Sequence, residues 1–410
     1  MTPLQSDLKA PWPSHGGQRN ALLAHFGLPD NHPLLDFSTN LNPLGPPKWV
    51  AAQLASLSAG LALYPDPTYT NARRAIADSE GVSPDQVCLT NGGSEAIFLA
   101  ASLFAGQKAA ILQPAFGEYA RACDHYQIAI TQLPLQQPML MPGHFPGSLN
   151  IPNDPHDNPP DPLPDFLPDE ALISEAIRQQ DLILIARPNN PTATLIPAET
   201  ISRWLALAEQ FHCTLIIDEA FIDFCHPSEP GLVEHLQQSC LHQSRHLILL
   251  RSMTKLYTLP GLRLGYILAH ADLIRRLLAR QIPWSVNHLA AELVAPLLAD
   301  WPFLQATAHW LKTESDWLLP QLHALGYRIP TPAANFFLLQ DANTPAEEQS
   351  SADALFRHLL QQGILARHTH NFTGLNGKWL RLAIRSREEN QSLLAALQSW
   401  REQNRGERAC

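Results

Sequence analysis

The sequence predicts an α/β protein in which a mostly parallel sheet lies between two layers of helices. Between about residues 85 and 270, short apolar runs alternate with segments of helical periodicity. The runs are almost continuously apolar, which is typical of strands covered on both faces. The chain has 410 residues and 45% of them are hydrophobic, so it is long enough for a large core and a second domain.

Seven of these runs are expected to be strands. They are residues 87–90, 109–113, 128–133, 182–187, 214–220, 247–252 and 264–269. Between the runs, residues 94–104 and 198–211 show the spacing of amphipathic helices. Together they predict a large domain over residues 41–285.

The pattern changes after about residue 285 and predicts a smaller α+β domain over residues 286–410. We expect long helices at 287–325, strands near 334–340, 364–367 and 379–384, and a last helix from about 386. Residues 1–40 are too short to form a domain and are expected to pack on the smaller one.

Residues 134–168 contain eleven prolines. Because proline interrupts helices and central strands, this stretch is expected to be a surface insertion between a strand and a helix near 169–178. A proline-rich docking ligand is the alternative, but a linker is the commoner role of such composition.

Composition excludes several classes of partner. The net charge of −10 and the absence of a basic block argue against nucleic acid. The sequence predicts no signal peptide, and it contains no apolar run long enough to cross a membrane. The six cysteines are scattered, without a CxxC pair, and predict reduced thiols in the cytoplasm: Cys88, Cys123, Cys213, Cys225, Cys240 and Cys410. Of these, Cys88 and Cys213 fall in apolar runs and are expected in the core.

Lys255 differs from the other five lysines of the chain. It follows the apolar run 247–252 and lies in RSMTKLYTLPGLRLGY, among hydroxyls, glycines and a second cation, Arg263. A lysine held at the end of a buried strand loses its proton readily and acts as an amine nucleophile. The alternative is an ordinary loop lysine, and the surrounding pattern argues against it.

Asp218 closes another apolar run in IIDEAFIDF. A lone buried carboxylate is costly and needs a partner, and a protonated pyridine nitrogen is one that makes the ring an electron sink. Pairing with an arginine, or binding a metal, are the alternatives. No second carboxylate or histidine stands at metal-ligand spacing, and Glu219 faces the other way, so no metal is expected.

Two further strand ends carry groups suited to anion or ligand binding. NGGSEAI opens a helix, so Gly93 and Ser94 are expected at a helix N-terminus that attracts an anion, with Ser94 as its cap. ARPNNPTAT is expected to form a rigid loop from which Asn190 points an amide at a ligand. No GxGxxG or GxxxxGK[ST] motif occurs, which argues against dinucleotides and nucleoside triphosphates.

Four arginines near the C-terminus provide candidates for binding carboxylate or phosphate: Arg367, Arg381, Arg385 and Arg387. In an extended strand, residues 381 and 385 would share a face. Surface ion pairing is the alternative, favoured for Arg387 and less so for Arg367 and Arg381.

These elements, in this order, resemble the fold-type-I pyridoxal-phosphate enzymes over nearly the whole chain except the proline-rich stretch. Within that superfamily the chain is similar to histidinol-phosphate aminotransferases and more closely resembles the threonine-phosphate decarboxylases of cobalamin biosynthesis. The narrower resemblance is carried by HGGQRN (15–20), DFSTNLNPLGPP (36–47), YPDPTYTNAR (64–73), NGGSEAI (91–97), DEAFIDF (218–224), the Lys255 segment and NFTGLNGKWLRLAIRSREEN (371–390).

The resemblance implies a role for each candidate residue. Lys255 would form the Schiff base with pyridoxal 5′-phosphate, Asp218 would pair with its ring nitrogen, and Asn190 would bind its phenolic oxygen. The cofactor phosphate would be held by Gly93, Ser94, Ser252, Thr254 and Arg263. Phe116 is favoured over Tyr119 to cover the ring, and Tyr64 would reach the cofactor phosphate of a neighbouring subunit, which implies a homodimer. The substrate would be bound by His15, Asn40, Arg367 and Arg381.

The resemblance also implies the reaction. Aminotransferases of this kind usually carry tyrosine where this chain has Phe221. Phe221 and the HGG segment near the start both match a decarboxylase better than an aminotransferase. The expected reaction converts L-threonine O-3-phosphate into (R)-1-aminopropan-2-ol O-2-phosphate. Transamination of histidinol phosphate is the first alternative, and a ligand sensor without catalytic activity, built on the same fold, is the second.

Overall fold

The computed structural model describes residues 12–136, 166–225, 231–232, 243–341 and 352–407. Its centre is a seven-stranded sheet in the order β2-β8-β7-β6-β5-β3-β4. In this sheet β8 pairs antiparallel with β2 and β7, while the other neighbouring strands pair in parallel, so the predicted mostly parallel sheet is confirmed. The strands are β2 (Val87–Thr90), β3 (Lys108–Gln113), β4 (Ala129–Pro134), β5 (Leu182–Ala186), β6 (Thr214–Asp218), β7 (Leu247–Ser252) and β8 (Gly265–Ala269).

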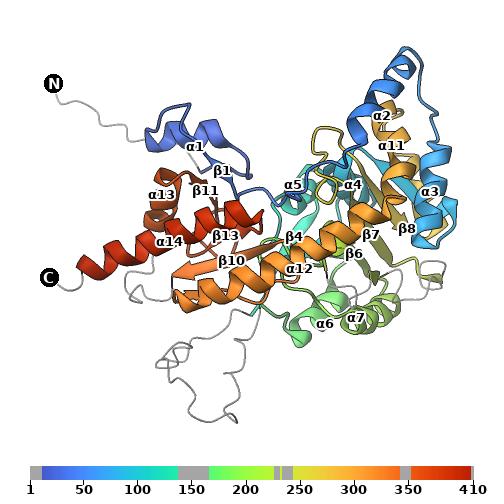
Figure 1. Ribbon diagram of the computed structural model, residues 1–410. Coiled ribbons are helices and arrows are strands. Elements are labelled where there is room, and N and C mark those ends of the chain that lie inside the picture. The colour runs from blue at the N-terminus through green and yellow to red at the C-terminus, as the bar shows by residue number, and fades with distance from the viewer. Residues whose placement is uncertain (1–11, 137–165, 226–230, 233–242, 342–351, 408–410) are drawn as a thin grey trace, which may run out of the picture.

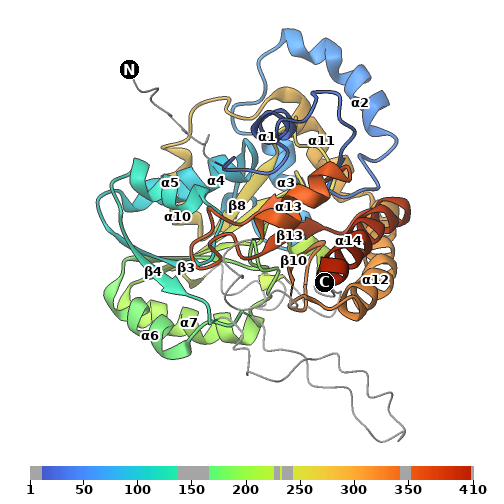
Figure 2. The same cartoon turned by 90° about the vertical axis from the view of Figure 1, so that its left-hand side faces the viewer.

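Helices cover both faces of this sheet because successive side chains of each strand point to opposite sides. On β5, for example, Leu184 joins the core under one helical layer, while Ile183 and Ile185 join the core under the other. Figure 2 shows α4, α5 and α10 on one side of the sheet and α6 and α7 on the other. The helices around the sheet are α2 (Val50–Leu57), α3 (Thr70–Glu80), α4 (Gly92–Ala101), α5 (Glu118–His125), α6 (Glu170–Gln179), α7 (Ala198–Phe211), α10 (Ala271–Leu278) and α11 (His288–Leu298).

One predicted strand is less buried than its apolar sequence suggests. β4 lies at the edge of the sheet, and five of its six residues are exposed. The expectation of cover on both faces was therefore wrong for this run, because an edge position, which depends on strand order, leaves one side of the strand unpaired.

A second, four-stranded antiparallel sheet has the order β12-β13-β10-β9. Figure 1 shows its elements, in orange and red, beside the large sheet, with the long helix α12 running along both. The elements of this part of the chain are α12 (Trp301–Ala324), β9 (Tyr327–Arg328), β10 (Phe336–Asp341), α13 (Asp353–Gln361), β11 (Ile364–Leu365), β12 (Arg367–His368), β13 (Leu380–Ala383) and α14 (Arg387–Glu407).

The N-terminal segment joins this second part of the molecule. After α1 (Arg19–Phe26), β1 (Leu35–Asp36) pairs in parallel with β11. By contrast, α11 comes after residue 285 in the chain but packs on α2 and α3, beside the large sheet. The division into domains near residue 285 stays a prediction.

Most of the proline-rich stretch, residues 137–165, lies outside the described residues, so its role stays a prediction. Its two flanks meet, because Gln136 and Leu167 form an antiparallel bridge beside the buried Phe166. The two described ends of the stretch therefore lie side by side, between β4 and α6.

Cys88 and Cys213 are buried core thiols as expected, and Cys123 is buried as well. In the part of the chain that the structure describes, no helix combines the length and the apolar character that crossing a membrane requires. The same part holds no cluster of three or more His, Cys, Asp or Glu side chains arranged to bind a metal.

Candidate active site

A cavity lies where the carboxyl ends of β5, β6 and β7 face the smaller sheet and the N-terminal segment. This is the edge at which parallel α/β sheets bind ligands, because the loops that follow the strands converge there. Thirteen of the fourteen predicted site residues line it: His15, Asn40, Gly93, Ser94, Phe116, Asn190, Asp218, Ser252, Thr254, Lys255, Arg263, Arg367 and Arg381. The exception is Tyr64.

Lys255 lies in the turn that follows β7, and its backbone carbonyl accepts a hydrogen bond from Asn42 N at 3.2 Å. Burial and then the positive charges of Arg381 and Arg263 lower the pKa of its ammonium group to about 8, against an opposing effect of Asp36. The neutral, nucleophilic amine is therefore far more accessible near neutral pH than in an ordinary lysine. The remaining lysines in the described ranges lie on the surface.

Asp218 ends β6 at the floor of the cavity. Its Oδ2 accepts a hydrogen bond from the Tyr119 hydroxyl at 2.7 Å, and its Oδ1 accepts one from Ala220 N at 2.9 Å. Burial raises its pKa, and no cation pairs with it among the described residues. A buried carboxylate without a cation, open to a cavity, fits the protonated nitrogen of a ring bound there.

Glu219, the next residue, points to the other side of the strand as predicted. It forms a fully buried ion pair with Arg187 at 2.8 Å and contacts Arg251 at 3.3 Å. Alternation along the strand thus separates a structural carboxylate from the one that faces the cavity.

The N-terminus of α4 and Arg263 form a cradle for an anion. A Cβ on Gly92 would lie 2.4 Å from Nη2 of Arg263, and one on Gly93 would lie 3.8 Å from Cβ of Ser252. A guanidinium beside a helix N-terminus is electrostatically unfavourable unless an anion lies between them. The hydroxyl of Thr254 is buried without a hydrogen-bond partner among the described residues, so the cradle fits a phosphate.

One detail of this cradle differs from the expectation. Ser94 was predicted to cap the helix, but α4 begins at Gly92, with Asn91 in the cap position and no side-chain cap. Ser94 is therefore a first-turn residue that faces the cavity. The glycine in the left-handed region, Gly92 at φ 78°, starts the helix earlier than its apolar periodicity indicates.

The predicted rigid loop after β5 is present. Asn189 is buried and donates to the carbonyl of Pro114 at 3.1 Å, while its side-chain oxygen accepts from Thr192. Asn190 consequently faces the cavity, where its side-chain oxygen accepts a hydrogen bond from Arg381 at 2.5 Å.

Arg381 and Arg367 are adjacent buried cations on paired strands, in register across β12 and β13. Burial lowers the pKa of Arg381 to about 9 and that of Arg367 to about 10. Neither forms an ion pair with a carboxylate in the described ranges. Arg381 donates to Asn190 and to the Ser38 carbonyl instead, and its guanidinium lies over Phe336.

Arg385 does not join them. β13 ends at Ala383, so the extended geometry that would have placed residues 381 and 385 on one face does not continue, and Arg385 pairs with Glu389 at 2.8 Å. Arg387 forms the expected ion pair, with Glu314 at 3.1 Å.

The N-terminal segment closes one wall of the cavity. Arg367 donates to the carbonyls of Pro13 and Ser14, at 3.2 and 2.7 Å, and so holds this segment in place. A Cβ on Gly16 would lie 2.3 Å from the Ser38 carbonyl oxygen, which explains physically why glycine follows His15. His15 itself lies 3.2 Å from Glu118.

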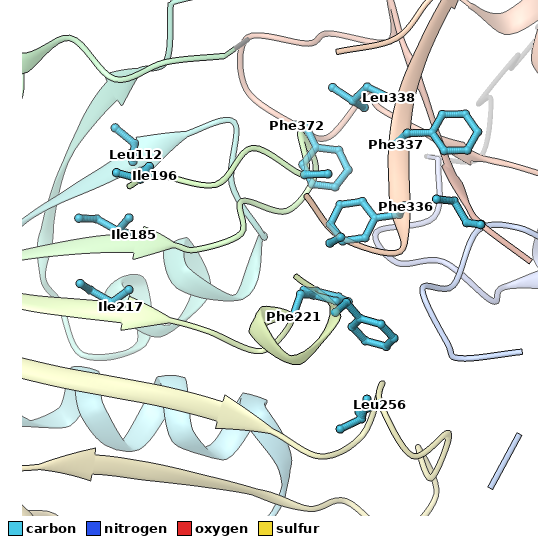
Figure 3. Close-up of a cluster of buried hydrophobic side chains, with 14 of the residues drawn as sticks. Leu112, Ile185, Ile196, Ile217, Phe221, Leu256, Phe336, Phe337, Leu338 and Phe372 are labelled. Carbon is cyan, nitrogen blue, oxygen red and sulfur yellow. The ribbon is translucent and has the colours of Figure 1, made fainter. Parts of the chain in front are cut away.

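Aromatic side chains complete the cavity. Phe116 lines it, with its ring centroid 6.0 Å from that of Tyr119 in an edge-on contact. Because the hydroxyl of Tyr119 is committed to Asp218, this geometry favours Phe116 for covering a bound ring. Figure 3 shows Phe221 beside Phe336 of β10, with ring centroids 4.9 Å apart.

Several contacts of the site lie beyond what the sequence predicted. Asp36 accepts hydrogen bonds from Ser38 and Thr39 and so shapes the loop that leads to Asn40. Asn371 receives a bond from Arg367 and donates to the Ser14 carbonyl. Asp36 lies within the motif DFSTN and Asn371 within NFTG, and these motifs were the sequence signal that could have indicated both residues.

Such groups as Lys255, Asp218 and the anion cradle, at this edge of an α/β sheet, fit a pyridoxal-phosphate-dependent enzyme of fold type I. Residues 32–397 match the family model "Aminotransferase class I and II". The chain belongs to the class I and II aminotransferase family.

Relatives within that family narrow the comparison. The chain is 34% identical to a threonine-phosphate decarboxylase of Salmonella typhimurium over 94% of this chain and 96% of the relative. It is similar to the crystal structure of the histidinol-phosphate aminotransferase from Clostridium acetobutylicum, with a TM-score of 0.76 and 29% identity, covering 90% of this chain and 100% of that one. The L-threonine-O-3-phosphate decarboxylase from Porphyromonas gingivalis shares the fold, with a TM-score of 0.70 and 24% identity, over 89% of this chain and 99% of that one.

Proposed function

We propose that the protein is a pyridoxal-phosphate-dependent decarboxylase that converts L-threonine O-3-phosphate into (R)-1-aminopropan-2-ol O-2-phosphate, a step of cobalamin biosynthesis. The observation that carries the substrate class is the pair Arg367 and Arg381, two buried cations without carboxylate partners in the described ranges, beside Lys255. Two such cations match a substrate with two anionic groups. The decarboxylase relative, matched over nearly its whole length, supports the reaction.

The cofactor-binding residues are assigned as follows. Lys255 supplies the amine that binds the cofactor, Asp218 faces its ring nitrogen and Asn190 its phenolic oxygen. The phosphate is held by Gly93, Ser94, Ser252, Thr254 and Arg263, and Phe116 covers the ring. When bound, pyridoxal phosphate would supply an electron sink for the pair released when a bond to Cα of the substrate breaks.

The protein's own residues select which bond breaks. Arg381, held by Asn190 and the Ser38 carbonyl, binds one anionic group of the substrate, and Arg367 with His15 and Asn40 binds the other. Fixing both groups sets the orientation of the Cα–carboxylate bond, and orientation decides which bond cleaves. Lys255 Nζ then donates a proton to Cα, and this proton takes the place of the carboxylate that leaves as carbon dioxide.

The decisive experiment incubates the purified holoenzyme with L-threonine O-3-phosphate and no keto acid. Release of one carbon dioxide per substrate, abolished by Lys255→Ala, is the expected result. A second candidate is transamination of histidinol phosphate, favoured by the likeness to the Clostridium aminotransferase. Conversion of histidinol phosphate that depends on 2-oxoglutarate, with no carbon dioxide from threonine phosphate, would replace the first proposal by the second.

We also propose that the protein acts as a homodimer in the cytoplasm, without nucleic acid or membrane partners. Tyr64 supports the dimer, because it is 84% exposed and its ring lies 5.0 Å from that of Trp284, with Leu63 and Ile282 each 74% exposed. An exposed apolar patch of this kind marks an interface. Sedimentation of the holoenzyme at twice the chain mass supports this assignment, and a monomer that is fully active contradicts it.

A further inference from the structure

Tyr119 and Asp218 meet at the floor of the cavity although 99 positions separate them in the sequence. Tyr119 lies in the first turn of α5 and is 2% exposed. Its hydroxyl donates to Oδ2 of Asp218 at 2.7 Å, while Ala220 N donates to Oδ1. The carboxylate is thus held at both oxygens by neutral donors.

The chemistry of the pair leaves only one direction for the tyrosine hydrogen bond. Burial raises the pKa of Tyr119 well above 10, so the hydroxyl keeps its proton throughout the neutral range. Burial also raises the pKa of Asp218, and the bond from Tyr119 is the first of the effects that lower it again. The hydroxyl therefore favours the ionised carboxylate in a place where no side-chain cation of the described ranges pairs with it.

We propose that Tyr119 is a positioning residue for the cofactor, which holds Asp218 ionised and oriented so that its remaining lone pairs face the ring nitrogen. The inference rests on the role assigned to Asp218 in the proposed function. In this role Tyr119 acts through Asp218.

A second contact adds to this role. The ring of Tyr119 meets that of Phe116 edge-on, at 87° between the ring planes, and Phe116 lines the cavity one turn earlier in the chain. Phenylalanine at position 119 would preserve this contact and remove only the hydroxyl. The substitution therefore separates the hydrogen bond from the packing.

The test uses Tyr119→Phe, with Tyr327→Phe as the matched control. Tyr327, in β9 of the smaller sheet, is also 2% exposed, and its hydroxyl donates to the backbone carbonyl of Leu397 in α14. Losing a hydrogen bond to a charged group should raise the Kd of pyridoxal phosphate for the apoprotein, followed by absorbance, about tenfold or more. The kcat should fall about tenfold or more with KM changed little. The control variant should change neither value.

A double-mutant cycle with Asp218→Asn separates action through Asp218 from a general structural effect. If Tyr119 acts through that carboxylate, the effect of Tyr119→Phe on the Kd should shrink to about twofold or less in the Asp218→Asn background. Equal effects in both backgrounds, or a Kd and kcat like those of wild type, overturn the inference. These outcomes leave the proposed function standing, because that fails only if the wild-type holoenzyme releases no carbon dioxide from threonine phosphate.

Discussion

Lys255→Met should stabilise the cofactor-free protein near neutral pH, even though it abolishes activity. The folded structure lowers the pKa of Lys255 from 10.5 to about 8, chiefly through burial and then through Arg381 and Arg263. At pH 7 the lysine is protonated in both the folded and unfolded states, so folding places a charge where the structure disfavours it.

The size of the effect follows from that difference of about 2.5 in pKa. At about 1.36 kcal/mol per pKa unit, the folded apoprotein is destabilised by about 3 kcal/mol below pH 8. Between pH 8 and 10.5 the unfolded state binds more protons than the folded state, so the penalty declines as the pH rises. The same difference leaves about one amine in ten neutral at pH 7, against about one in three thousand for an ordinary lysine.

Urea unfolding of the apoprotein at pH 7, 8, 9 and 10 measures this directly. The free energy of unfolding of wild type should approach that of Lys255→Met as the pH rises, with most of the change above pH 8. Lys312→Met, at an exposed lysine paired with Asp316, should show no such trend. A difference between wild type and Lys255→Met that is the same at every pH would refute the reasoning.

Three further substitutions test other parts of the site. Gly16→Ala should raise KM for the phosphorylated substrate about tenfold or more, because its Cβ would meet the Ser38 carbonyl at 2.3 Å; steady-state kinetics would show it, and an unchanged KM would contradict it. Asp218→Asn should lower kcat about a thousandfold while the cofactor still binds Lys255, as absorbance would reveal. Arg187→Met should lower the free energy of unfolding by about 3–5 kcal/mol, because it breaks a fully buried pair and leaves Glu219 with the longer contact to Arg251. Much of that loss should return when Glu219→Leu is added, as denaturant unfolding would report.

The fold could be predicted from the sequence largely because burial is visible in composition. The runs that became β5, β6 and β7 are continuously apolar, and in the structure nearly all their residues are buried. β4 is less apolar, because it contains Thr131, Gln132 and Pro134, and it lies at the edge. Its position depends on the order of the strands, which is a property of the whole sheet.

The site divides in a similar way. Lys255, Asp218 and Asn190 were predictable because each follows a buried strand, and the ends of parallel strands meet at one edge. The error at Ser94 arose because Gly92 extends the helix backward, and the error at Arg385 because β13 ends two residues before it. Both depend on where an element stops, which periodicity defines poorly.

The sequence by itself determined the fold class and the residue types that carry the chemistry, since hydrophobic runs and strand-end motifs are local properties of the chain. Only the tertiary structure decided the environments of those residues. It placed Arg381 beside Lys255, gave Arg381 and Arg367 no carboxylate partner within the part of the chain that it describes, and brought Tyr119 to Asp218. Burial and the proximity of charges set the pKa and orientation of each group, and both depend on segments that lie far apart in the chain.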